Sequence, residues 1–180
     1  VHAVTGEELR QWLAGTLELP ARSVILTFDL GGHSSQDSVP RVLEVFRKYQ
    51  MFGLFTIYHP PKYEGMDAGT SIYCPDDRCW EAFRIAYNSG YATIGTHTIR
   101  DFVQVDEKEG MAEIAESKRV IEEKIGNGCE VFLLTWPLES VPSWAKNLKS
   151  IGIDIAFGGY TYPILENAVW QDKPEDWYKL

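Results

Sequence analysis

The chain has 180 residues, of which 44% are hydrophobic and 24% are charged, ordinary values for a folded chain forming one domain of about 150 residues plus a short flank. Seventeen Lys and Arg residues against 26 Asp and Glu residues give a net charge of −9, which disfavours a general nucleic-acid binder or a partner on an anionic membrane surface. From its length we expect a single domain over residues 1–180. We expect no membrane span, because the apolar runs are too short to cross a bilayer.

Patterns typical of helices and strands alternate along the chain. The first is a helix that Thr5 can cap, with Glu8 at capping-box spacing and Gly15 as a natural stop. Short apolar runs rich in β-formers then alternate with stretches of helical spacing. The expected helices cover residues 5–15, 39–49, 76–90, 108–125 and 141–148, and the expected strands cover residues 23–29, 52–58, 91–95, 131–135 and 151–157.

About five strand–helix alternations predict an α/β fold with parallel strands and outer helices. The run 23–29 is typical of a strand buried on both faces. Periodicity leaves open whether the sheet is doubly wound or closed into a barrel. In either case reactive groups gather at the carboxyl ends of the strands. The candidates at those ends are Asp29, Tyr58, His59, His97, Thr135 and Tyr160.

Asp29 and His97 end different strands, so the fold can bring them together. Such a pair can act as base and ligand, or both can hold a metal ion. Asp101 follows His97 by four residues, and in a helical turn it faces the same point. The structural alternative is that Asp29 caps a turn, His97 bonds a backbone carbonyl, and Asp101 pairs with Arg100 or Arg119.

The three cysteines leave the redox compartment open. Cys74 and Cys79 flank a short turn that can bring them within disulfide distance. Two ordinary thiols, with Cys79 buried in the first turn of a helix, are the equal alternative. A zinc site built from this pair alone is disfavoured, because its spacing is not that of structural zinc sites. We expect Cys129, just before a strand, to be a free thiol.

Several segments resemble one enzyme family. Residues 23–32, with Thr-Phe-Asp-Leu-Gly, resemble the first motif of polysaccharide deacetylases, usually Thr-Phe-Asp-Asp-Gly. In that family the motif belongs to the NodB-homology domain of carbohydrate esterase family 4, which this segment resembles. Residues 38–56 look like that family's next helix and strand, and residues 94–98 resemble its second motif, His-Ser/Thr-x-x-His. Residues 4–21 and 156–180 are similar to the flanks of its poly-N-acetylglucosamine deacetylase branch.

The resemblance implies a distorted or incomplete (β/α) barrel. It also implies a divalent metal ion, usually zinc, held by Asp-His-His, with a second Asp as general base. The reaction removes acetyl groups from a carbohydrate polymer of N-acetylated amino sugars. Metal polarisation of the amide and a carboxylate that takes a proton from water suit this chemistry. The family also implies a secreted or cell-envelope location.

Carried over residue by residue, the motifs match incompletely. Asp29 falls on the family's base, and His97 falls on the first metal-binding His. Leu30 stands where the metal-binding Asp is expected and cannot coordinate an ion. Asp101 stands at the second metal-binding His and can still ligate zinc through oxygen. Thr135 replaces the Arg of the third motif and is a candidate substrate-binding residue.

Other side chains near the strand ends complete the set of candidates. His33 and His59 can fill a gap in the metal site, although exposed loop histidines are the structural alternative. Trp136, Tyr160 and Tyr162 can stack on a sugar ring, although aromatic residues at strand ends are also common packing residues.

Two functions follow from these matches. The first is a metal-dependent hydrolase that removes N-acetyl groups from an amino-sugar polymer with a modified divalent-metal site. The second is a catalytically inactive domain of the same fold that binds a glycan or a partner. Retention of Asp29 and His97 favours the first function, and Leu30 and Thr135 favour the second.

Overall fold

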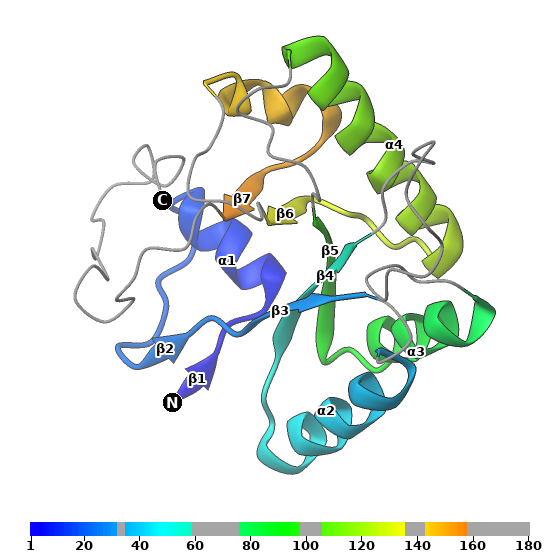
Figure 1. Ribbon diagram of the computed structural model, residues 1–180. Coiled ribbons are helices and arrows are strands. Elements are labelled where there is room, and N and C mark those ends of the chain that lie inside the picture. Colours follow the sequence, from blue (N-terminus) through cyan, green and yellow to red (C-terminus); the bar gives the residue numbers. More distant parts are fainter. Residues whose placement is uncertain (32–34, 59–75, 98–105, 136–142, 158–180) are drawn as a thin grey trace, which may run out of the picture.

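The computed structural model describes residues 1–31, 35–58, 76–97, 106–135 and 143–157 (Figure 1). Its centre is a five-stranded parallel sheet in which neighbours in space are also neighbours in the chain, in the order β3-β4-β5-β6-β7. A doubly wound sheet would reverse its order. The observed order is that of a barrel. Within the described part of the chain β3 and β7 do not pair, so the barrel is incomplete, as expected. The strands are β3 (Thr27–Leu30), β4 (Gly53–Tyr58), β5 (Ala92–His97), β6 (Leu133–Thr135) and β7 (Ile155–Phe157).

Three helices cover the outer face of this sheet (Figure 1). They are α2 (Ser35–Tyr49), α3 (Asp77–Asn88) and α4 (Glu107–Ile125). Because side chains alternate between the two faces of a strand, every second residue of β4 and β5 meets these helices. The outer core contains Leu43, Phe46, Phe55, Ile57, Phe83, Ile94, Ile114, Ile121 and Leu134.

The inner face is filled from the amino end of the strands by α1 (Gly6–Leu13). The capping box between Thr5 and Glu8 forms as expected and fixes the start of this helix. Leu9 is fully buried, and the backbone N–H of Gly6 donates to the Thr93 hydroxyl at 3.1 Å. Because α1 packs at the amino ends of the strands, the inner face at their carboxyl ends is left for the candidate site residues. The inner core contains Val4, Leu9, Leu54, Phe132, Leu133 and Ile155.

Two expectations about the elements were wrong. The run 23–29 is not one strand, because β2 (Ser23–Val24) pairs with β1 (His2–Ala3) in a separate small sheet before β3 begins. Nor is it buried on both faces, since Thr27 and Asp29 are exposed on an edge strand. The helix expected over residues 141–148 is a 3₁₀ helix at Ala145–Ile151, which ends at Gly152 in the left-handed conformation.

The remaining expectations concern membrane spans and cysteines. In the part of the chain that the structure describes, every helix is too short or too polar to cross a bilayer.

Cys129 is a buried free thiol, as expected. Cys79 is disulfide-bonded and therefore not an ordinary thiol. Cys74, its candidate partner, lies outside the described residues. Asp76 caps α3 by accepting from the backbone N–H groups of Arg78 and Cys79.

Candidate functional site

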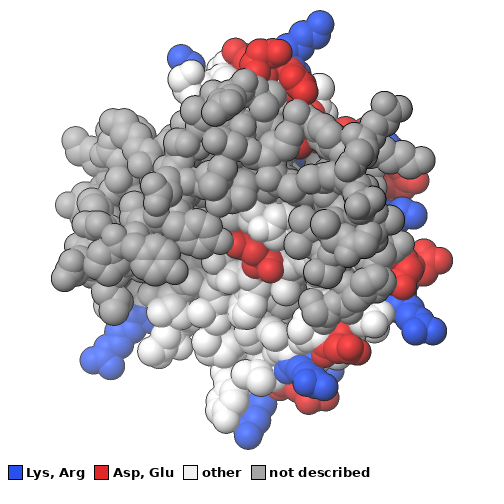
Figure 2. All heavy atoms as spheres, viewed as in Figure 1, with Lys and Arg blue, Asp and Glu red and all other residues white. Residues whose placement is uncertain are grey.

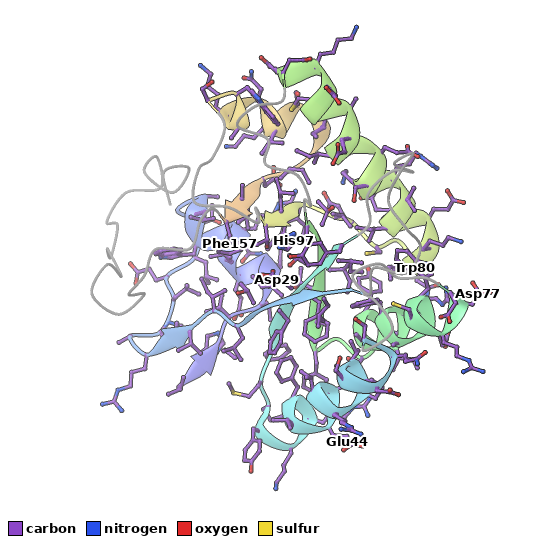
Figure 3. The ribbon with its side chains drawn as sticks, in the orientation of Figure 1. Asp29, Glu44, Asp77, Trp80, His97 and Phe157 are labelled. Carbon is purple, nitrogen blue, oxygen red and sulfur yellow. The ribbon has the colours of Figure 1, made fainter. Side chains whose placement is uncertain are left out.

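The structure brings Asp29 and His97 together at the carboxyl edge of the sheet (Figure 3). The His97 Nε2 atom lies 3.6 Å from Asp29 Oδ2. This is longer than a regular hydrogen bond, but it places the imidazole and the carboxylate in direct polar contact. Asp29 is in β3 and His97 is the last residue of β5. The expectation that the fold brings these two side chains together is therefore confirmed.

The carboxylate of Asp29 is held from its other side by β4. Thr56, fully buried and in register with Asp29, donates its hydroxyl to Asp29 Oδ1 at 2.7 Å. Burial by itself would raise the pKa of Asp29, but the polar contacts with His97 and Thr56 outweigh it and hold the pKa below its usual value. Asp29 is thus an ionised carboxylate at neutral pH, with 33% of its side chain still exposed.

His97 is the rigid member of the pair. Its side chain is completely buried, and its ring stacks on that of Tyr58 with centroids 3.8 Å apart and planes inclined by 26°. Tyr58 is its register neighbour on β4. Because the ring is fixed by a strand and by stacking, the direction in which its Nε2 points is fixed as well.

A row of four side chains crosses the sheet beside this pair. Tyr58, His97, Thr135 and Phe157 are register neighbours on β4, β5, β6 and β7, so their side chains share the inner face. The hydroxyl oxygen of Thr135 is buried and makes no hydrogen bond within the described part of the chain. Figure 3 shows Phe157 close to His97 and Asp29 in projection. This row combines a hydroxyl with aromatic surface.

Leu30 lies on the opposite face from Asp29. Its half-buried side chain packs against the outer core that α2, α3 and α4 cover. Leucine stands here in place of the Asp that the family's motif usually has. It therefore supplies no metal ligand and adds apolar packing on the outer face.

Among the described residues, the side chains that can bind a metal here are Asp29 and His97. No group of three or more His, Cys, Asp or Glu side chains with metal-binding geometry occurs in these parts of the chain. An imidazole nitrogen and a carboxylate oxygen that converge on one point are suitable donors for zinc. A mononuclear zinc site needs at least one further protein ligand.

The other expected site residues cannot be compared with the structure. Asp101, His33 and His59 lie outside the described residues, as do the aromatic candidates Trp136 and Tyr160. Tyr162 is also outside them. Their assigned roles remain predictions.

Thr56 is the contact that sequence reasoning missed. A strand that is otherwise apolar over Gly53–Tyr58 carries one polar side chain in its interior. A polar residue that is buried in this way normally has a specific hydrogen-bond partner. That rule was a usable signal, but the sequence alone does not identify Asp29 as the partner.

The surface around the pair is open to solvent in part. Figure 2 shows acidic atoms exposed near the centre of the view, where Figure 3 places Asp29. An ionised carboxylate beside a fixed imidazole, reachable from solvent, can accept a proton from a water molecule or share a cation with the imidazole.

Comparison with known proteins gives a consistent result. The family model described as polysaccharide deacetylase matches residues 16–149. Comparison with curated protein sequences gave no match.

The deacetylase domain of BpsB from Bordetella bronchiseptica has a TM-score of 0.64 at 15% identity, covering 87% of this chain and 71% of that chain. The deacetylase PplD from Streptococcus pyogenes, in complex with acetate, has a TM-score of 0.66 at 12% identity, covering 87% and 65%. A family 4 carbohydrate esterase from Streptomyces lividans, also in complex with acetate, has a TM-score of 0.52 at 16% identity, covering 74% and 60%. At these identities the likeness establishes the fold, whereas the family model covers most of the sequence. This chain belongs to the polysaccharide deacetylase family.

Proposed function

We propose that this protein removes N-acetyl groups from a polymer of amino sugars, with a divalent metal ion bound at a modified site. The observation that carries the proposal is the 3.6 Å approach of Asp29 to His97 at the carboxyl edge of the sheet. The chain belongs to the polysaccharide deacetylase family, and in the proposed reaction this pair would supply a base and a metal-binding imidazole in one place.

Each side chain has a definite task in this proposal. Asp29 is ionised and partly exposed, so it can accept the proton of the water that attacks the amide. His97 supports metal binding because its ring is buried and fixed. Asp101 would be a further ligand. The metal ion, when bound, polarises the amide carbonyl and acidifies water. Thr135 would be a substrate-binding residue, since its hydroxyl oxygen makes no hydrogen bond within the described part of the chain.

We expect a secreted or cell-envelope compartment, which suits this substrate. A secreted or cell-envelope location would place the protein beside such polymers. The disulfide of Cys79 supports that location, because disulfides persist in oxidising compartments.

The alternative is a domain of this family that binds a glycan without hydrolysing it. Leu30 favours this alternative because its side chain is part of the apolar packing on the outer face, away from Asp29. With Leu30 absent from the ligand set, the metal must be held by fewer or different side chains than the resemblance implies.

The test is acetate release from an N-acetylglucosamine oligomer with zinc supplied. Wild type should release acetate, and Asp29→Asn should lower the rate by about 100-fold or more, as expected for loss of a general base. The matched control is Glu44→Gln, which also removes one carboxylate, because Glu44 is exposed on α2 and lies far from the site in Figure 3. It should react like wild type. Oligomer binding without acetate release by the wild type would establish the alternative.

A further inference from the structure

Thr56 lies on β4, between the neighbouring strands β3 and β5. It is in register with Asp29 of β3 on one side and with Gly95 of β5 on the other. Thr56 is fully buried on the inner face of the sheet, in contact with Asp29 of the Asp29–His97 pair. A threonine here can satisfy its hydroxyl only by hydrogen bonding inside the protein.

The direction of the Thr56 hydroxyl is fixed by its neighbours. A Cβ atom built on Gly95 would lie 3.0 Å from the Thr56 methyl group and 2.8 Å from the Leu133 carbonyl oxygen. The absence of a side chain at Gly95 therefore leaves the space that the methyl group occupies. Because threonine is branched at Cβ, seating the methyl towards β5 fixes the rotamer and directs the hydroxyl towards β3.

The hydroxyl has one proton and two acceptors within reach. Oδ1 of Asp29 lies at 2.7 Å and the backbone carbonyl oxygen of Phe28 at 3.4 Å. The shorter contact, to a charged group, is much the stronger. The bond therefore holds one carboxylate oxygen of Asp29 and leaves Oδ2 facing His97 Nε2.

We propose that Thr56 is a positioning residue for Asp29, and that Gly95 serves the same role indirectly by fixing the Thr56 rotamer. This inference rests on the proposed function for its kinetic consequence, but not for its structural one. Thr56 touches no reacting atom. It determines which carboxylate oxygen of Asp29 is available.

The variants separate the effect of the Thr56 hydroxyl from the effect of the packing of the Thr56 side chain. Thr56→Val keeps the branched shape and removes the hydroxyl, whereas Thr56→Ser keeps the hydroxyl. The matched control is Thr96→Val, because the Thr96 hydroxyl is equally buried and bonds Ser117 at 2.7 Å on the opposite face of the sheet. If Thr56→Val does not fold, Thr56→Ala removes the same hydroxyl.

Two measurements are made on each variant. In acetate release, Thr56→Val should lower kcat by about 10-fold to 100-fold with KM changed by less than about twofold, because misplacing a catalytic group costs rate and not substrate binding. Thr56→Ser should restore most of kcat, and Thr96→Val should match wild type. In crystal structures, the Asp29 carboxylate of Thr56→Val should leave the position it has in wild type.

The outcomes separate this inference from the proposed function. Wild type without acetate release would defeat the proposed function, and the crystal structures would still decide the role of Thr56. An unmoved Asp29 carboxylate in Thr56→Val would overturn the inference, as would an unchanged kcat or a Thr56→Ser variant no better than Thr56→Val.

Discussion

Asp29 and Leu30 are adjacent in the chain, yet their side chains serve opposite faces of the sheet. Asp29 faces His97 on the inner side, and Leu30 packs against the helix-covered outer core. Consecutive residues of a strand must alternate in this way. The motif Thr-Phe-Asp-Leu-Gly therefore contributes one carboxylate to the site while β3 stays regular through Leu30.

Leu30→Asp should destabilise the protein and should not raise its zinc content. The new carboxylate would enter an apolar environment and lose the packing of leucine, at a cost of about 1–3 kcal/mol in the free energy of unfolding. Denaturant unfolding and zinc stoichiometry measure the two effects. Leu30→Ala is the control, since it loses packing without adding charge. A Leu30→Asp protein that gains zinc at no cost in stability would show that residue 30 can turn to the inner face.

Thr5→Ala should remove the capping box of α1 and lower the free energy of unfolding by about 1 kcal/mol. Thr5 accepts from the Glu8 backbone N–H at 3.1 Å, and the Glu8 carboxylate accepts from the Thr5 backbone N–H at 2.9 Å. The helix that they start packs Leu9 into the inner core. Thr16→Ala is the comparison, because Thr16 lies beyond the end of the helix and its exposed hydroxyl donates to the Gln11 carbonyl. Equal unfolding midpoints for the two variants would contradict this account of α1.

Cys129 should resist alkylation in the native protein at pH 8. Burial, together with the nearby Glu122 carboxylate, raises the pKa of its thiol from about 9 to about 12, and the reactive species is the thiolate. The unfolded chain ionises this thiol near its ordinary pKa, so its contribution to stability is full below about pH 9 and is lost as the pH rises towards 12. Iodoacetamide labelling followed by mass spectrometry checks this, with unreduced, denatured protein as the control. Rapid native labelling of Cys129, or a disulfide-linked Cys129 peptide, would contradict it.

Much of the fold follows from local patterns that act over a few residues. The cap at Thr5 lies where its side chain and the spacing to Glu8 indicated. Asp29 and His97 meet because parallel strands present their carboxyl ends at one edge, which alternation alone predicts.

What the sequence did not predict depends on which strands pair. The boundary between β2 and β3 falls inside one apolar run, and nothing local marks where the chain changes its partner strand. The Thr56 hydrogen bond likewise depends on the register of β4 against β3. The family resemblance aligned Leu30 with a ligand position, but only the packing of the outer core shows which way the side chain points.

His97→Ala tests the metal site in the most direct way. We propose that the fixed imidazole is the strongest ligand of the set, because neutral imidazole binds zinc more tightly than the carboxylates around it. Even the loss of a partner that only supports a ligand costs about 10-fold to 100-fold in metal affinity. Loss of His97 itself should cost more. His2→Ala is the control, since His2 lies in the small sheet and pairs with Glu8.

The decisive measurement is the rate of acetate release from an N-acetylglucosamine oligomer as a function of zinc concentration, for wild type, His97→Ala and His2→Ala. The account predicts saturable activation of wild type and His2→Ala, with His97→Ala either inactive or needing more than about 100-fold more zinc. Activation curves that coincide for wild type and His97→Ala, or no acetate release by wild type at any zinc concentration, would contradict a metal-dependent deacetylase centred on Asp29 and His97.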